Sequence, residues 1–198
     1  MKKKLIVVVD MVNGFVNIGA LHDSYINHIV PGIKNLVEES IAEGNDVISF
    51  RDCHSLDDIE FETYPIHCLN GTEESELVPE LKPLGAKMID IPKNTTNGFN
   101  TERFREFYQA HYEEYDEIVV VGCCTDICVT DFTTSLVEFQ KENGINTPIT
   151  VPMDLVETFD GPNHDRKVMN EVGFEKMRRA GINLVESYVS QKQKQYVL

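Results

Sequence analysis

The chain has 198 residues, 41% of them hydrophobic, which is enough for one domain with a sizeable core and leaves little room for two. Its 33 acidic and 18 basic side chains give a formal charge of −15, and a surface this negative repels nucleic acids and anionic membranes. The apolar run Leu5–Val9 is too short for a secretory signal, and no stretch approaches the ~20 residues of a membrane span. We therefore expect a cytoplasmic protein whose five cysteines are free thiols.

Short apolar runs alternate with helical patterns along the chain. The apolar runs predict strands at 5–9, 46–52, 87–92, 117–122, 147–152 and 182–187. The helical patterns predict helices at 31–44, 101–115, 125–143 and 163–181. This alternation is typical of a Rossmann-like, three-layer α/β/α fold with a six-stranded, mainly parallel sheet. We predict a single domain over residues 1–190, followed by a polar tail at 191–198.

Ionisable groups or thiols follow four of the predicted strands directly. In chain order they are Asp10, Asp52 with His54, Lys93, and a cysteine cluster at 123–128. Taken singly, an aspartate after a strand is more often a turn residue than a catalyst. The carboxyl ends of parallel strands meet at one edge, however, and ligands bind there at the switch point of the strand order. The four positions therefore predict one site.

The segment "VGCCTDICV" holds three of the five cysteines, Cys123, Cys124 and Cys128. Free cysteine is often a small core residue, and that is the simpler interpretation for Cys123. Cys128 would lie in the first turn of the predicted helix, with Thr125 as its cap. Because a helix N-terminus favours a thiolate, we expect Cys128 to have a lowered pKa and to act as a nucleophile. A nucleophile needs a base, and the available partners are Asp10 and Lys93.

The long irregular segment after the second strand contains a possible metal site. Side chains alternate in extended chain, so Asp52 and His54 point the same way. Glu60 and His67 complete a set of oxygen and imidazole ligands that would suit Zn²⁺, Fe²⁺ or Mn²⁺. The alternative is that Glu60 is a solvated loop acid and that His67 only packs.

Three segments, "VVVDMVNGF", "IPKNTTNGFN" and "VVVGCCTDICVTDF", resemble in this order the signatures of the isochorismatase-like cysteine hydrolases, a family that includes the nicotinamidases. The likeness spans about Lys4 to Ser187. It implies the fold of that family and an Asp-Lys-Cys triad of Asp10, Lys93 and Cys128. It also implies a cis peptide between Cys123 and Cys124, and an oxyanion hole formed by the backbone amides of Cys124 and Cys128.

The segments "RDCH" and "YPIHCLNGT" resemble the metal-binding pieces of the nicotinamidase branch. This implies that Asp52, His54 and His67 bind a metal, with Glu60 as the fourth ligand used by some members. Phe15 and Tyr64 resemble the aromatic walls that hold the substrate ring. The chain departs from the family where Val12 and Gly14 replace polar residues of the first signature, which leaves the finer substrate contacts open.

The resemblance implies a metal-assisted cysteine amidohydrolase, a nicotinamidase that converts nicotinamide and water to nicotinate and ammonia through a thioester. Zinc is the expected metal, with iron and manganese as alternatives, no organic cofactor is expected, and homo-oligomers are expected. Branches that cleave the vinyl ether of isochorismate lack the nucleophilic cysteine, so Cys128 favours amide chemistry. Two alternatives remain: a relative acting on another small amide, such as a carbamoyl or ureido compound, and a non-catalytic, thiol-based ligand-binding or redox-sensing module.

Overall fold

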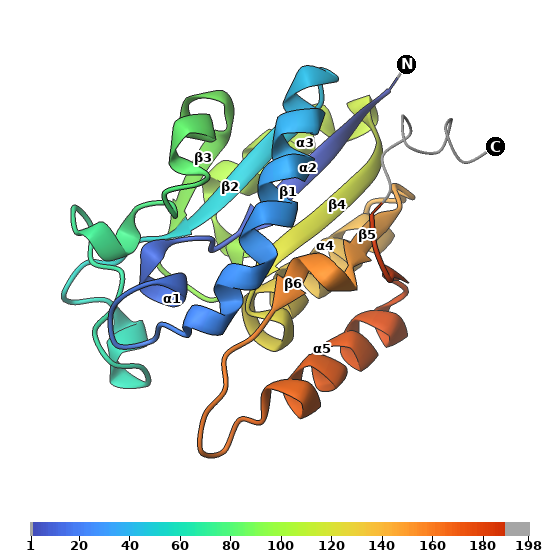
Figure 1. Cartoon of the computed structure of the whole chain (residues 1–198). Coiled ribbons are helices and arrows are strands. Elements are labelled where there is room, and N and C mark those ends of the chain that lie inside the picture. Colours follow the sequence, from blue (N-terminus) through green and yellow to red (C-terminus); the bar gives the residue numbers. More distant parts are fainter. Residues whose placement is uncertain (1, 189–198) are drawn as a thin grey trace.

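The computed structural model describes residues 2–188, so the predicted tail at 191–198 lies outside the described residues. Within residues 2–188, seven strands form one sheet, and every strand pair is parallel (Figure 1). The strands are β1 (Lys3–Val9), β2 (Asp46–Asp52), β3 (Ile89–Lys93), β4 (Tyr115–Cys123), β5 (Ile149–Pro152), β6 (Val156–Glu157) and β7 (Asn183–Val185). The predicted fold class is confirmed, and the six predicted strands correspond to β1–β5 and β7.

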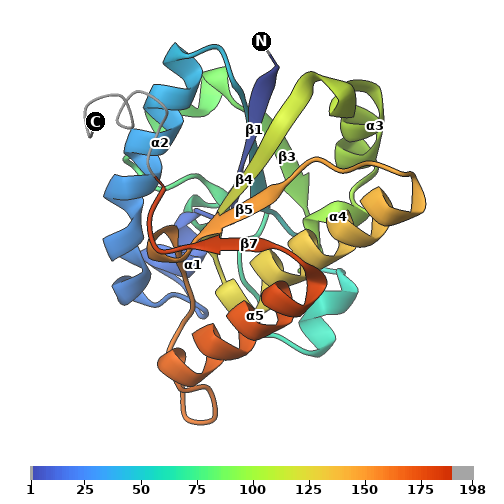
Figure 2. The same ribbon diagram turned by 90° about the vertical axis from the view of Figure 1, so that its right-hand side faces the viewer.

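The helices cover both faces of the sheet. They are α1 (Asn13–Val16), α2 (Val30–Ala42), α3 (Glu102–His111), α4 (Thr130–Glu142) and α5 (Arg166–Ala180). Figure 2 shows α2 on one face and α3, α4 and α5 on the other. The side chains of β1 alternate accordingly, since Ile6 and Val8 pack with Ile33 of α2, whereas Val7 packs in the cluster that contains Phe132 of α4.

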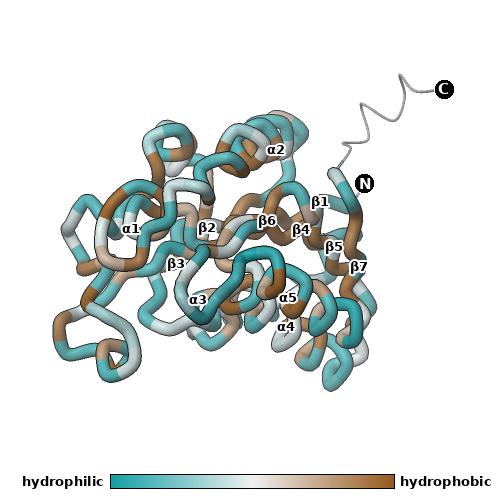
Figure 3. The backbone as a smooth tube through the Cα atoms, turned by 60° about the horizontal axis from the view of Figure 1, so that its bottom comes forward, coloured by the Kyte–Doolittle hydropathy of each residue, from teal (hydrophilic) through white to brown (hydrophobic). Residues whose placement is uncertain are grey.

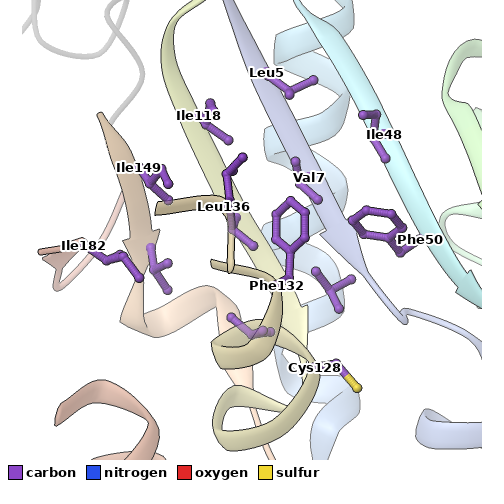
Figure 4. Packing of buried hydrophobic residues seen from close by; sticks show 14 of the residues in the cluster. Leu5, Val7, Ile48, Phe50, Ile118, Cys128, Phe132, Leu136, Ile149 and Ile182 are labelled. Carbon is purple, nitrogen blue, oxygen red and sulfur yellow. The ribbon is translucent and has the colours of Figure 1, made fainter. Parts of the chain in front are cut away.

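Strands and helices both contribute to the core, and Figure 3 shows hydrophobic residues in the strands of the sheet. Figure 4 shows the cluster on the side of α4, with Phe50, Phe132 and Leu136 between strands and helix. Cys128 lies at one end of this cluster. Among the described residues, no helix combines the length and the apolar character that crossing a bilayer requires.

The predicted helix at 125–143 begins differently from our expectation. A π-helical turn, Thr125–Val129, precedes α4, and the residue at its N-cap is Cys124. Thr125 does not cap the helix, because its buried hydroxyl has no hydrogen-bond partner within residues 2–188. The wide turn keeps Cys128 at the opening of the helix, next to the end of β4.

The strand order β3-β2-β1-β4-β5-β7 changes direction between β1 and β4. At this switch point Val9 pairs with Gly122. Gly122 has φ +116°, and a Cβ there would lie 2.1 Å from the carbonyl oxygen of Val9, so only glycine fits. The end of β4 can thus approach β1 closely, and the segments that follow the two strands line one cavity.

Candidate active site

The structure brings Asp10, Lys93 and Cys128 to the carboxyl edge of the sheet. Asp10 follows β1 in the left-handed region, with φ 52°, a conformation that is costly for a residue other than glycine and is typical of functional sites. Lys93 ends β3, and its ammonium lies 2.8 Å from Asp10 Oδ2 and 3.0 Å from Asp52 Oδ1. It also donates to the carbonyl of Thr95 at 3.0 Å. Lys93 therefore makes two hydrogen bonds, to Asp52 and Thr95, and an ion pair with Asp10.

Asp10 is fully buried, and this burial raises its pKa to about 7, although Lys93 and the neighbouring Cys128 thiol act in the opposite direction. Among the described residues, neither carboxylate oxygen of Asp10 accepts a hydrogen bond of standard geometry. A carboxylate in this state is a much better proton acceptor near neutral pH than an ordinary aspartate.

The expectation of a lowered Cys128 pKa is wrong. Burial raises the pKa of the Cys128 thiol well above its ordinary value, and the attraction of Lys93 does not offset it because the carboxylate of Asp10 also opposes the thiolate. Desolvation of the buried thiol thus has a larger effect on the Cys128 pKa than the position at the start of the helix. Lys93 differs, since burial disfavours its charge but the carboxylates of Asp10 and Asp52 raise its pKa well above the ordinary value. The raised pKa of Cys128 favours the neutral thiol over the thiolate.

The cysteine cluster contains no disulfide, since all five cysteines are free. The peptide bond between Cys123 and Cys124 is cis, as the resemblance implies. Cys123 is fully buried and its thiol donates to the carbonyl of Asp10 at 3.2 Å, so it is a packing residue. Cys124 and Cys128 are each 8% exposed, and both line the cavity described below.

Asp52, His54 and His67 form a compact group of candidate metal ligands, with one atom from each within 4.8 Å of the others. His54 Nε2 lies 3.0 Å, and His67 Nε2 3.1 Å, from Asp52 Oδ2. The second ring nitrogen of each histidine faces an acceptor, at 3.1 Å for Asp58 Oδ2 and 2.7 Å for the Pro65 carbonyl.

These contacts test whether the group suits a metal. Each Nδ1 must carry a proton in order to donate, so in a neutral ring each Nε2 presents a lone pair toward a carboxylate oxygen. Lone pairs this close repel unless a proton or a cation lies between them. Moreover, His67 Nε2 is buried without a hydrogen-bond partner among the described residues. Two imidazoles and one carboxylate that converge in this way fit a divalent cation.

The remaining predicted residues surround a cavity of about 480 Å³, a typical size for a small-molecule site. Phe15 and Tyr64 line it, together with Cys128 and Lys93. Glu60 also lines it, but lies outside the compact ligand group, with Oε1 3.9 Å from His67 Nε2.

Two further segments that line this cavity, 20–24 and 159–162, were not predicted. They are tied together, since the Asp23 carboxylate accepts from the Asp160 amide and forms an ion pair with Arg166. Arg166 also donates to the Thr158 carbonyl and lies 4.1 Å from the centre of the Tyr25 ring. These segments carry no reactive motif, so the only available signal was the turn-forming "DGPN" at 160–163.

Comparison with known proteins identifies the family of this chain. The family model described as "Isochorismatase domain" matches residues 4–174. Nicotinamidase 1 of Arabidopsis thaliana is 31% identical over 91% of this chain and 84% of that protein. N-carbamoylsarcosine amidase from Thermoplasma acidophilum has a similar structure, with a TM-score of 0.77 and 25% identity over 96% of this chain and 99% of that one.

The pyrazinamidase of Pyrococcus horikoshii, solved in complex with zinc, superposes with a TM-score of 0.73 at 21% identity, over 92% of this chain and 98% of that one. That likeness shows a shared fold. The match of the family model over most of the chain and the identity to the plant enzyme go further. The chain belongs to the isochorismatase family and is a hydrolase.

Proposed function

We propose that this enzyme is a metal-assisted cysteine amidase that hydrolyses nicotinamide to nicotinate and ammonia. The observation that carries the proposal is one cavity lined by a buried thiol, a lysine between two carboxylates, and a carboxylate–imidazole group. The likeness to the plant nicotinamidase supports the choice of substrate.

Asp10 is proposed as the base that starts the reaction. It takes the proton of the Cys128 thiol while the sulfur attacks the carboxamide carbon, so that charge does not build up on an isolated thiolate. The backbone amides of Cys124 and Cys128 are proposed to donate to the resulting oxyanion, an effect of about 10²–10³ in rate for one good donor.

The same carboxyl group completes the turnover. Asp10 returns its proton to the leaving nitrogen, the C–N bond breaks, and ammonia departs from a Cys128 thioester. Asp10 then takes a proton from water, whose oxygen attacks the thioester carbon; the C–S bond breaks, and the proton returns to Cys128. The nicotinic acid formed releases its remaining acid proton to solvent and leaves as nicotinate. Lys93 stays protonated throughout and keeps Asp10 and Asp52 in position.

Asp52, His54 and His67 are proposed to hold a divalent metal, zinc first, with Glu60 in reach of a further position. When bound, the metal would coordinate the pyridine nitrogen and fix the ring relative to Cys128, and such orientation is worth several kcal/mol. Phe15 and Tyr64 are proposed as walls of the ring pocket. The zinc in the Pyrococcus horikoshii pyrazinamidase supports this choice.

The test is release of ammonia from nicotinamide by the purified protein. Cys128→Ala is expected to abolish release, while Cys53→Ala, which removes a partly buried thiol outside the cavity lining, is expected to leave it unchanged. Release that survives in Cys128→Ala would refute the nucleophile, and a wild-type protein inactive on nicotinamide would refute the substrate.

An amidase for a carbamoyl compound is the second candidate, favoured by the likeness to N-carbamoylsarcosine amidase. Metal content separates the two. The nicotinamidase is expected to be purified with about one equivalent of metal and to lose activity to a chelator, whereas an enzyme that is metal-free and indifferent to chelation would favour the carbamoyl substrate. Membership of a hydrolase family leaves the non-catalytic thiol module without support. Homo-oligomers and a cytoplasmic location stay predictions.

A further inference from the structure

His54 has only one remaining freedom, the orientation of its ring. Its backbone amide donates to the carbonyl of Cys68 at 2.9 Å, and its own carbonyl accepts from Asn70 at 2.8 Å. These two bonds fix the main chain of a residue whose side chain is fully buried. A flip of the ring would turn Nδ1 instead of Nε2 toward Asp52 and His67, and a change of tautomer would move the proton from Nδ1 to Nε2.

Asp58 is placed to prevent both changes. Its Oδ2 lies 3.1 Å from His54 Nδ1, and an ionised carboxylate can only accept, so Nδ1 keeps its proton. Nε2 is then the nitrogen that faces Asp52 Oδ2, 3.0 Å away, across a second proton or a cation. His67 is fixed differently, by the backbone carbonyl of Pro65. Of the two histidines of the candidate metal group, therefore, His54 is the one whose Nδ1 faces another side chain.

Asp58 is itself held in place from two sides. The backbone amide of Ser55 donates to Oδ2 at 2.8 Å, and the side-chain amide of Asn94 donates to Oδ1 at 2.9 Å. Asn94 directly follows Lys93. The loop that carries Asp58 is thereby tied to the end of the strand that supplies the lysine.

We propose that Asp58, anchored by Asn94, is a positioning residue that presents His54 Nε2 to a divalent cation at the candidate metal site. The inference rests on the metal part of the proposed function. Carboxylates behind metal-bound histidines fix the ring and raise its basicity, and their loss typically weakens metal binding about 10–100-fold. We expect a loss in that range for Asp58→Ala, and a smaller loss for Asn94→Ala, which removes only the anchor.

The experiment uses the full-length protein, stripped with a chelator and titrated with Zn²⁺ against a chromophoric competitor. Asp57→Ala is the matched control, because it removes a carboxylate from the neighbouring residue. The Asp57 side chain is exposed, and within residues 2–188 it makes no hydrogen bond or ion pair. The expected result is weaker Zn²⁺ binding in Asp58→Ala and unchanged binding in Asp57→Ala. Thermal unfolding of the stripped variants is the check that each variant is folded.

Two further readouts separate positioning from general support of the loop. The ¹⁵N shifts of His54 in the metal-free protein are expected to show a protonated Nδ1 in the wild type and a partly unprotonated Nδ1 in Asp58→Ala, while Asp58→Asn, which keeps an acceptor, restores the protonated Nδ1. If Asn94 acts through Asp58, the double variant Asp58→Ala/Asn94→Ala is expected to bind no more weakly than Asp58→Ala alone.

Unchanged Zn²⁺ affinity in Asp58→Ala, or an equal loss in Asp57→Ala, would overturn the inference and leave the proposed function standing. A wild-type protein that binds no divalent metal would overturn the metal part of the proposed function, and this inference with it.

Discussion

Replacing Asp10 by asparagine removes the proposed base with little change of shape. Alanine would be a poorer test, because Asp10 lies at φ 52°, in a region that asparagine tolerates better than most residues. Lys93 keeps Asp52 Oδ1 at 3.0 Å and the Thr95 carbonyl at 3.0 Å, so its charge does not become isolated. We therefore expect Asp10→Asn to fold.

The expected loss in kcat/KM follows from the protonation state of the Cys128 thiol. Burial raises the Cys128 pKa well above its ordinary value, so a site without a base holds very little thiolate at pH 7. General base catalysis contributes about 10²–10⁴ in rate. The expected loss in kcat/KM is about 10³-fold, which corresponds to ~4 kcal/mol of transition-state stabilisation.

The assay is ammonia release from nicotinamide under kcat/KM conditions, with alkylation of Cys128 by iodoacetamide as a second measurement. Both rates are expected to fall in Asp10→Asn. Asp116→Asn, an exposed acid near the start of β4, serves as the control for the lost charge. If kcat/KM for Asp10→Asn stayed within tenfold of the wild type, Asp10 could not be the base.

Two more predictions concern the pH profile and the switch point of the sheet. Because the Asp10 pKa is raised to about 7, lowering the pH through 7 protonates the base, and kcat/KM is expected to fall about tenfold per unit below it; a flat profile between pH 5 and 8 would contradict this. Gly122→Ala would place a Cβ 2.1 Å from the Val9 carbonyl at φ +116°, so urea unfolding is expected to show a loss of about 3 kcal/mol or more. Gly44→Ala, at φ +79° but with no neighbouring atom within 4 Å, is expected to cost only about 1 kcal/mol, and equal losses would refute the close-approach explanation.

The sheet and the central residues of the site were predictable for the same reason. Each of Asp10, Asp52 and Lys93 ends a run of apolar residues, and parallel strands bring such ends to one edge. The alternation of side chains likewise predicted that Asp52 and His54 point the same way, and their ligand atoms lie 3.0 Å apart.

What escaped prediction depends on tertiary structure. β6 is two residues long and exists only through its pairing with Gly122 and Cys123, so it has no periodic signal. Asp58 is one of several acids in an irregular loop, and nothing local distinguishes it from Asp57. The prediction of a lowered Cys128 pKa was wrong because burial raises this pKa. The position of a residue at the start of a helix can be read from the sequence, whereas its depth of burial cannot.

The switch point between β1 and β4 also divides the chemistry between two lengths of chain. The proposed base, amine and metal ligands all precede α3, while the sulfur and the proposed oxyanion donors follow it. Neither portion holds a complete reaction centre by itself. Two fragments separated between α3 and β4 would regain turnover only by docking β4 beside β1, so recovered activity would measure how well the two portions reassociate.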